Sequence, residues 1–312
     1  VGAMTFGGSL QAPPGLFKDL NDEILGDAII LNGKQLFIDD YIIDELSGAE
    51  KVLNQPVKHP RNPILVSDQP WETVWHPNHG SVMYDQEEKI FKMWYINYTS
   101  DLKRQQLAYA TSRDGISWQK PLINKADGTN IIPGFSADNP PCVFKDSAET
   151  DPNRRYKMLY GDNPDGTSKS LSTHAAYSPD GLHWTPEPQN PLIPHSDTLS
   201  CPYWDRRLGR YVAYLRYGPP NTRIVSRVES EDFVHWSPKV TVLRRTNLDA
   251  PLATQFYGMR IMPYEGVYLG LIEAYHTETL KPIPHDKPWT DRKNIQLAFS
   301  RNGLTWSRVV SQ

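Results

Sequence analysis

The 312-residue sequence contains only two cysteines, Cys142 and Cys201. Two thiols are too few for a disulfide scaffold or for a zinc site built from cysteines, so we expect both to be reduced and to lie in strands. The compartment stays open, with a periplasmic or secreted location favoured slightly over a cytoplasmic one. No apolar run approaches the roughly 18 residues that a membrane-spanning helix requires, so we expect no membrane partner.

The sequence also lacks an excess of either charge. Its 33 Lys and Arg residues nearly balance 36 Asp and Glu residues, the formal net charge is -3, and the basic residues are scattered. Nucleic acids attract clustered positive charge, so we expect no nucleic-acid partner. The length suits one large all-β domain or two ordinary domains.

Proline, glycine and aromatic residues are abundant. The chain has 27 Pro, 20 Gly, 9 Trp, 16 Tyr and 9 Phe. Many short strands joined by tight turns favour this mixture, whereas helical proteins avoid it. The composition therefore predicts an all-β protein.

One short phrase occurs four times. The copies are SRDGISW (112–118), SPDGLHW (178–184), SEDFVHW (230–236) and SRNGLTW (300–306). Each copy follows three strand-like segments and opens a fourth, and a constant four-strand core with variable connections is typical of a propeller blade. A β-sandwich is the alternative, but it gives no reason to repeat this signature at blade spacing.

The repeated phrase has the chemistry of a turn. Ser and Asp side chains can accept hydrogen bonds from backbone amides, Gly permits a positive φ, and Trp can pack between neighbouring blades. We therefore expect the tryptophans of the four phrases to belong to the scaffold and not to a catalytic site. They are Trp118, Trp184, Trp236 and Trp306.

Several segments resemble a known family. They are LFIDDYII (36–43), LNQPVKHPRNPIL, SVMYDQEEKIFKMWY, YATSRDGISW, SDTLSCPYWDRRLGRYVAYLR and PYEGVYLGL. Together they resemble the bacterial glycosyl hydrolase family 32 N-terminal-like proteins, over nearly the whole chain from about residue 28. The resemblance implies a five-bladed β-propeller related to glycoside hydrolase families 32, 43 and 68.

Four blades are evident in the sequence, so the fifth needs strands from elsewhere. We expect residues 1–27 to be an N-terminal extension and residues 28–312 to form a single propeller domain. The N-terminal segment offers GKQLFIDDYII, AEKVLNQPV and the stretch near NPIL as strands. A partner chain is the other source, because an unfilled edge can pair with another copy in a homo-oligomer.

Carboxylates at the mouth of the propeller are the candidate catalytic groups. If the innermost strands are aligned on their terminal acids, which include Asp146 and Asp205, then Asp138 and Asp197 both stand eight positions earlier. We expect both side chains to face the central funnel, where paired carboxylates can hydrolyse a glycosidic bond. The alternative is that each aspartate only caps a turn.

The first blade departs from the family pattern. The resemblance implies a catalytic Asp at the start of its inner strand, but this chain has WETVWHPNHGSV there, in which the nearest carboxylate is Glu72. The fourth blade offers a replacement, because Glu273 in an otherwise apolar strand suits a general acid. Glu273 could instead be a structural residue paired with Arg260 or Arg216, and Asp249 is a weaker loop candidate.

The remaining polar and aromatic residues at the mouth suit sugar binding. We expect hydrogen bonding or ring stacking to the substrate, and the spacing of HPNH does not match a helical metal motif, so we predict no metal ligands. The expected substrate-binding residues are Trp75, His76, Asn78, His79, Arg216, Tyr257 and His276.

These features together predict a glycosidase that is exo-acting on an oligosaccharide or polysaccharide. We expect paired carboxylates to carry the reaction without a cofactor, and a structural calcium in the channel is compatible with this chemistry. Two alternatives stay open: a sugar-binding propeller without catalysis, and a propeller polysaccharide lyase.

Overall fold

The computed structural model describes residues 34–72, 80–98, 104–163, 171–196, 200–218, 222–246, 249, 253–277 and 292–309. The chain divides into two compact units, residues 1–52 and 53–312. The boundary expected at residue 27 lies outside the described residues. In the first unit, residues 34–52 form turns and bends, with an ion pair of 2.5 Å between Lys51 and Asp40. Within the described ranges, no helix is long and apolar enough to cross a membrane.

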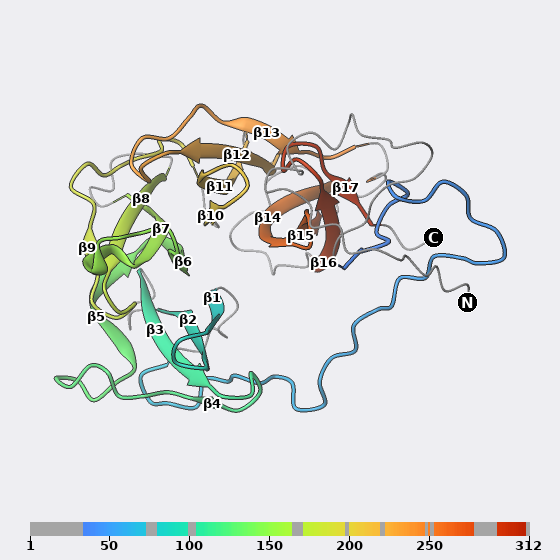
Figure 1. The fold of residues 1–312 in the computed structure, drawn as a ribbon. Helices are drawn as coiled ribbons and strands as arrows, with labels where there is room; N and C mark the ends of the chain where they lie inside the picture. The colour runs from blue at the N-terminus through green and yellow to red at the C-terminus, as the bar shows by residue number, and fades with distance from the viewer. Residues whose placement is uncertain are drawn as a thin grey trace, which may run out of the picture. The chain divides into compact units, whose positions relative to one another are not determined.

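The second unit contains four antiparallel sheets, one for each repeat of the sequence (Figure 1). The first blade contains β1 (Gly80–Asp85), β2 (Ile90–Tyr98), β3 (Gln105–Ser112) and β4 (Trp118–Gln119), with β5 (Ile131–Ala137) also paired to β3. The second blade contains β6 (Asn139–Lys145), β7 (Tyr156–Asp162), β8 (Ser172–Ser178) and β9 (Thr185–Pro186).

The third and fourth blades repeat this order. The third contains β10 (Cys201–Asp205), β11 (Arg210–Tyr217), β12 (Ile224–Ser230) and β13 (Val240–Leu243). The fourth contains β14 (Ala253–Tyr264), β15 (Val267–Thr277), β16 (Arg292–Ser300) and β17 (Ser307–Arg308). A short 3-10 helix, η1 (Pro152–Arg154), lies between β6 and β7.

Successive blades pack against one another through their sheet faces. The first strand of each blade contacts the first strand of the next, from β1 through β6 and β10 to β14. Adjacent residues of β7 show why these strands are apolar on both sides: Met158 lies in the core shared with the first blade, and Leu159 in the core shared with the third. Because successive side chains point to opposite faces, both faces must be apolar. The predicted all-β propeller with four evident blades is confirmed.

The fifth blade is not formed by the described residues. Residues 34–72 contain no strand, so the strands expected in this N-terminal stretch were predicted wrongly. In AEKVLNQPV and the stretch near NPIL, Pro56, Pro60 and Pro63 lack the N–H that a sheet ladder needs, whereas GKQLFIDDYII contains no proline. On the fourth blade, apolar side chains remain exposed on the face away from the third blade; they are Met262, Leu271 and Ile295.

The four repeated phrases form the same turn. In the first, Ser112 Oγ accepts a hydrogen bond from Gly115 N at 2.9 Å, and Asp114 Oδ1 accepts hydrogen bonds from the amides of Ile116 and Ser117. Trp118 Nε1 then donates to the Gly115 carbonyl at 3.2 Å. The same bonds recur in the other three phrases, so their predicted scaffold role is confirmed.

Phe233 replaces glycine in the third phrase although its φ is 68°. At the equivalent position of the second phrase, a Cβ on Gly181 would lie 2.6 Å from the Trp94 ring of the preceding blade. In the third phrase, the neighbouring residue of the preceding blade is Leu159 in place of a tryptophan, which leaves room for a ring. Phe233 fills that space and is fully buried. Packing therefore outweighs the cost of the left-handed backbone, about 1–2 kcal/mol.

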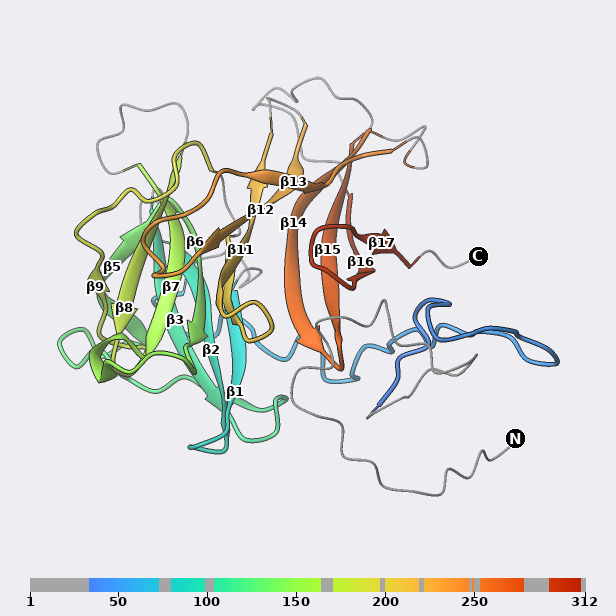
Figure 2. The same cartoon turned by 45° about the horizontal axis from the view of Figure 1, so that its top comes forward.

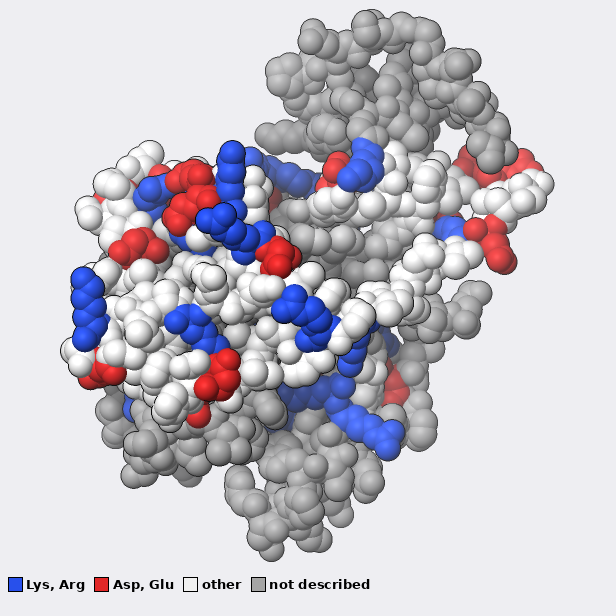
Figure 3. All heavy atoms as spheres, turned by 90° about the horizontal axis from the view of Figure 1, so that it is seen from below, with Lys and Arg blue, Asp and Glu red and all other residues white. Residues whose placement is uncertain are grey.

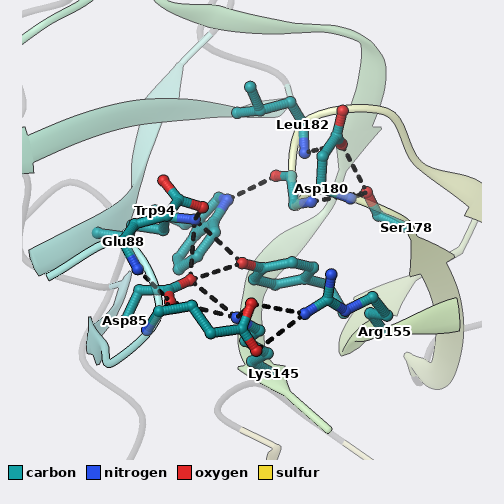
Figure 4. Close-up of polar contacts among 12 residues, drawn as sticks. Asp85, Glu88, Trp94, Lys145, Arg155, Ser178, Asp180 and Leu182 are labelled. Atoms are coloured by element: carbon teal, nitrogen blue, oxygen red, sulfur yellow. Dashed lines mark hydrogen bonds and ion pairs between the residues drawn. The ribbon is translucent and has the colours of Figure 1, made fainter. Parts of the chain in front are cut away.

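Buried aspartates connect each blade to the next. Asp85, at the end of β1, accepts a hydrogen bond of 3.0 Å from Tyr156 Oη on the second blade (Figure 4). Asp146 binds Tyr211 of the third blade in the same way, at 2.7 Å. Asp205 then binds Tyr268 of the fourth blade at 2.5 Å. We call these three contacts the Asp–Tyr latches.

The first latch also holds two lysines. Lys92 Nζ lies 3.0 Å and Lys145 Nζ 3.1 Å from Asp85 Oδ2. Burial opposes the charged form of Asp85, but hydrogen bonds from the two ammonium groups hold its pKa well below its usual range. The ion pair thus outweighs the desolvation of the carboxylate.

We expect Phe233→Gly to lower the free energy of unfolding by about 2–4 kcal/mol. Loss of the buried ring costs about 3–5 kcal/mol of stability. Glycine also removes the strain of the left-handed backbone, about 1–2 kcal/mol, which offsets part of that loss. Urea denaturation measures the change, with Leu304→Ala, an exposed position in the fourth phrase, as the control. An unchanged or higher stability of Phe233→Gly would contradict the packing argument.

Asp85→Asn should lower the stability by about 1–3 kcal/mol at pH 7, because Lys92 and Lys145 lose a buried carboxylate and keep only the exposed Glu88 and Glu87 as acidic partners. A depressed pKa stabilises the fold above the unfolded value of about 3.9, and this contribution disappears as the pH falls toward the folded value. The difference between the variant and the wild type should therefore narrow below about pH 4. Urea denaturation from pH 7 to pH 2.5 measures this, and Glu50→Gln, an exposed site, is the control; a constant difference over that range would contradict the ion pair.

Candidate functional site

The beginnings of the innermost strands and the ends of the second strands lie at one edge of the blades, because these strands are antiparallel (Figure 2). We call it the funnel edge. Asp138 directly precedes β6, Arg216 is next to the end of β11, and His276 is next to the end of β15. The other predicted residues at this edge lie outside the described residues. They are Trp75, His76, Asn78, His79 and Asp197.

A single arginine joins two carboxylates at the funnel edge. Arg104 Nη1 donates to Asp138 Oδ1 at 3.0 Å, and Arg104 Nη2 donates to Asp162 Oδ1 at 2.9 Å. The backbone N–H of Asn163 donates to Asp138 Oδ2 at 2.9 Å. We call this group the Arg104 clamp.

The clamp orients Asp138 without covering it. Its side chain is 28% exposed, and each carboxylate oxygen keeps a further lone pair after accepting one hydrogen bond. Its partners are far away in sequence, so Asp138 is held by tertiary contacts and not only by a local turn. Sequence reasoning missed Arg104, since an arginine at the start of a third strand gives no signal of its own.

His174 lies beside the clamp. It stands on β8 opposite Tyr160, with 5.5 Å between the ring centroids. Burial lowers the pKa of His174, while the charge of Asp162 acts in the opposite direction. The ring is therefore neutral near pH 7 and can accept or donate a hydrogen bond. The pairing of β7 with β8 places His174 beside Asp162 and the Arg104 clamp. The sequence does not show this pairing directly.

Glu273 lies on β15 on the same sheet face as Arg260. Burial opposes the charged form of Arg260, but the charges of its neighbours raise its pKa, and Glu273 is one of these neighbours. Glu273 thus interacts with one of the two arginines expected for a structural role. Arg260 also donates to the Cys142 thiol of β6. Burial raises the pKa of Cys142 to about 11, although Arg260 acts in the opposite direction.

Both cysteines are free and lie in innermost strands, Cys142 in β6 and Cys201 in β10, as predicted. Among the described residues, no group of three or more His, Cys, Asp or Glu side chains is arranged to hold a metal ion.

Glu72 is a structural residue in a buried network. Glu72 Oε1 accepts a hydrogen bond from Tyr95 Oη at 2.7 Å, and Glu72 Oε2 lies 2.7 Å from Lys120 Nζ. Only 3% of its side chain is exposed. Glu72 is therefore not available to replace the missing aspartate of the first blade. Asp249 is likewise engaged, with Arg308 at 2.7 Å.

Two of the predicted sugar-binding residues meet directly. The Arg216 guanidinium carbon lies 4.3 Å from the centroid of the Tyr257 ring. His276 Nδ1 lies 2.9 Å from Thr254 Oγ1, while His276 Nε2 is buried without a hydrogen-bond partner in the described structure. The funnel edge thus carries a cation–aromatic pair in addition to the Arg104 clamp.

No protein-family model matches the chain, and no curated protein matches it in sequence. Solved structures do resemble it. An N-acetylgalactosamine deacetylase from F. plautii, in complex with blood group B trisaccharide, aligns over 78% of each chain at 14% identity with a TM-score of 0.55. A putative glycoside hydrolase from Bacteroides ovatus ATCC 8483 aligns over 82% of each chain at 14% identity with a TM-score of 0.54.

A further glycosyl hydrolase from Bacteroides ovatus covers 80% of this chain and 78% of its own at 15% identity, with a TM-score of 0.51. At identities this low, the likeness concerns the fold and not the reaction. The chain therefore has the β-propeller fold that the glycoside hydrolases among these structures adopt, as the sequence resemblance implied.

We expect the effect of Arg104→Gln on the free energy of unfolding to be non-additive with the effects of Asp138→Asn and of Asp162→Asn. Removing the guanidinium leaves two carboxylates without their shared partner, and hydrogen bonds to charged groups contribute about 1–3 kcal/mol, less at this partly exposed site. Double-mutant cycles by urea denaturation should give coupling energies of about 0.5–2 kcal/mol. Arg104→Lys should not restore both contacts, because an ammonium lacks the planar fork; purely additive effects would contradict the clamp.

Proposed function

We propose that the chain is a glycoside hydrolase that acts on the end of an oligosaccharide at the funnel edge, without an organic cofactor. The observation that supports this most strongly is the position of Asp138. It directly precedes an innermost strand, and the Arg104 clamp holds it there with lone pairs still available. The propeller fold supports the proposal only at the level of the general class.

The proposed reaction needs two carboxyl groups with different tasks. In this proposal Asp138 acts as the nucleophile or as the base that activates water, because its oxygens already accept hydrogen bonds in fixed directions. Glu273 supplies the proton to the leaving oxygen. Asp197, which stands at the same sequence position relative to its strand as Asp138, is the third proposed catalytic residue.

The proposed sugar contacts come from several blades. Tyr257 offers a ring face to a pyranose or furanose, and Arg216 and His276 offer hydrogen bonds. The first blade would add further contacts of the same kind, from Trp75, His76, Asn78 and His79. Binding across several blades would hold one end of a saccharide chain over the carboxylates.

Asp138→Asn should lower kcat/KM by about 10²–10⁴-fold, because the amide can no longer act as a base or nucleophile. The activity is found first by screening aryl glycosides and plant or algal oligosaccharides with NMR of the products. Asp151→Asn is the matched control, because it makes the same change at an exposed position beside the short helix η1.

The products separate this proposal from its alternatives. A new reducing end shows hydrolysis, an unsaturated sugar shows a lyase, and released acetate shows deacetylation. Binding of sugars without any product would indicate a binding protein. Full activity of Asp138→Asn, or any product other than a hydrolysed saccharide, would contradict the proposal.

A further inference from the structure

The first blade contains a hollow beside the Arg104 clamp. It has a volume of about 320 Å³, and its lining runs from Gln106 of β3 to Ser136 of β5, entirely within the described residues. Pockets that bind small molecules have volumes of about 300–1,000 Å³, so this hollow suits one small ligand. We call it the β5 hollow, and β5 can be found beside β3 in Figure 1.

The hollow exists because β5 leaves its regular pairing with β3. Ser136 lies opposite Gln106, but the register shifts before Ala108 is reached. Pro133 lacks the N–H that the ladder needs, and Gly134 has a φ of 71°, which a regular strand does not allow. The chain of β5 therefore bulges between these two pairs, and bulges of this kind are frequent next to active sites.

Both walls of the hollow are fixed. Ile132 of the bulge is 1% exposed in the core shared with the second blade, and the Phe135 ring packs 5.2 Å from the ring of Tyr160. On the other side, Asn124 pairs with Thr129 in a short turn closed by backbone hydrogen bonds. The hollow is therefore formed before any ligand binds.

The lining combines amide, hydroxyl and apolar groups. Gln106 alternates along β3 with Leu107, which is buried against the second blade, so the Gln106 side chain points to the opposite face of the sheet. No hydrogen bond joins its amide to another described residue, so both its donor and its acceptor are available to a ligand. Ile131 and Pro133 add apolar surface. Sugars offer the matching groups, since they have hydroxyls that donate and accept and an apolar face of C–H groups.

The charge of the lining favours a neutral ligand. Asp127 is the one charged residue among the described residues that line the hollow. On the face shown in Figure 3, by contrast, basic and acidic side chains are interspersed. An anionic group in the hollow would meet the like charge of Asp127 and no lysine or arginine of the lining. A neutral sugar therefore fits the hollow better than a uronate or a sulfated sugar.

Ser136 connects the hollow to the proposed catalytic carboxylate. Arg104 Nε donates to Ser136 Oγ at 3.2 Å and Arg104 Nη2 donates to the Ser136 carbonyl at 3.1 Å, while Arg104 Nη1 holds Asp138. Ser136 also stands two residues before Asp138, a span of at most about 7 Å. A saccharide bound at Asp138 can therefore place a neighbouring sugar unit in the hollow.

We infer that the β5 hollow is a subsite for one neutral sugar unit, and that the saccharide bound at the funnel edge is a neutral oligosaccharide. Gln106 binds hydroxyl groups of that unit through its amide, and Ile131 contacts its apolar face. The inference rests on the proposed function in placing the reacting bond at Asp138. Binding in the hollow does not itself require hydrolysis.

Methyl NMR of protein labelled at isoleucine tests binding directly, because Ile131 lines the hollow. The probes are the neutral maltotriose, xylotriose and arabinotriose and the acidic trigalacturonate. We expect at least one neutral trisaccharide to shift the Ile131 methyl signal saturably and to bind at least five-fold more tightly than trigalacturonate. An Ile131 signal that none of the neutral sugars shifts, or equal or tighter binding of trigalacturonate, would overturn the inference.

Gln106→Leu should weaken binding of that trisaccharide at least five-fold, because it removes the amide and nearly keeps the size of the side chain. Gln119→Leu makes the same change at an exposed position of β4 in the same blade and should leave binding unchanged. Equal losses in the two variants, or no loss in Gln106→Leu, would contradict the subsite. A saturable Ile131 shift in a protein that hydrolyses no saccharide would retain the subsite and reject the proposed hydrolase, whereas hydrolysis without any shift at Ile131 would do the reverse.

Discussion

The Asp–Tyr latches are the contacts on which the positions of the blades depend. Each latch joins the end of one innermost strand to a tyrosine of the next blade, and the buried carboxylate can only be tolerated because its oxygens are satisfied. A blade displaced by one residue would leave a buried carboxylate without its partner. The latches therefore fix the position of each blade relative to the next along the direction of the innermost strands. This position also determines where side chains lie at the funnel edge.

Apolar packing between neighbouring blades adds to the contacts made by the latches. Large side chains of one blade contact small residues of the next, as Trp94 of the first blade contacts Gly181 of the second. Between the second and third blades the larger ring is on the turn instead, where Phe233 packs against Leu159. Only such complementary pairs fill the space between blades to the density of a protein interior. The four turns thus share one hydrogen-bond pattern but differ where the neighbouring blade differs.

The pairing of charged side chains differs between the scaffold and the funnel edge. Within the scaffold, buried cations such as Lys92 and Lys157 are paired with carboxylates, as the cost of burying an isolated charge requires. At the funnel edge, the Asp138 carboxylate keeps lone pairs that no hydrogen bond of the described residues uses. Polar groups that are left incompletely satisfied at a solvent-accessible edge can be satisfied by a ligand.

The sequence by itself determined the four-strand repeat, the turns and the place of Asp138 before an innermost strand. These features depend on hydrogen bonds and side-chain alternation between residues close in the chain, so their pattern is visible in the letters. Only the tertiary structure decided that Arg104 joins Asp138 to Asp162 and that Glu72 is buried. These contacts join residues tens of positions apart, and their geometry follows from how blades pack, which no local pattern specifies.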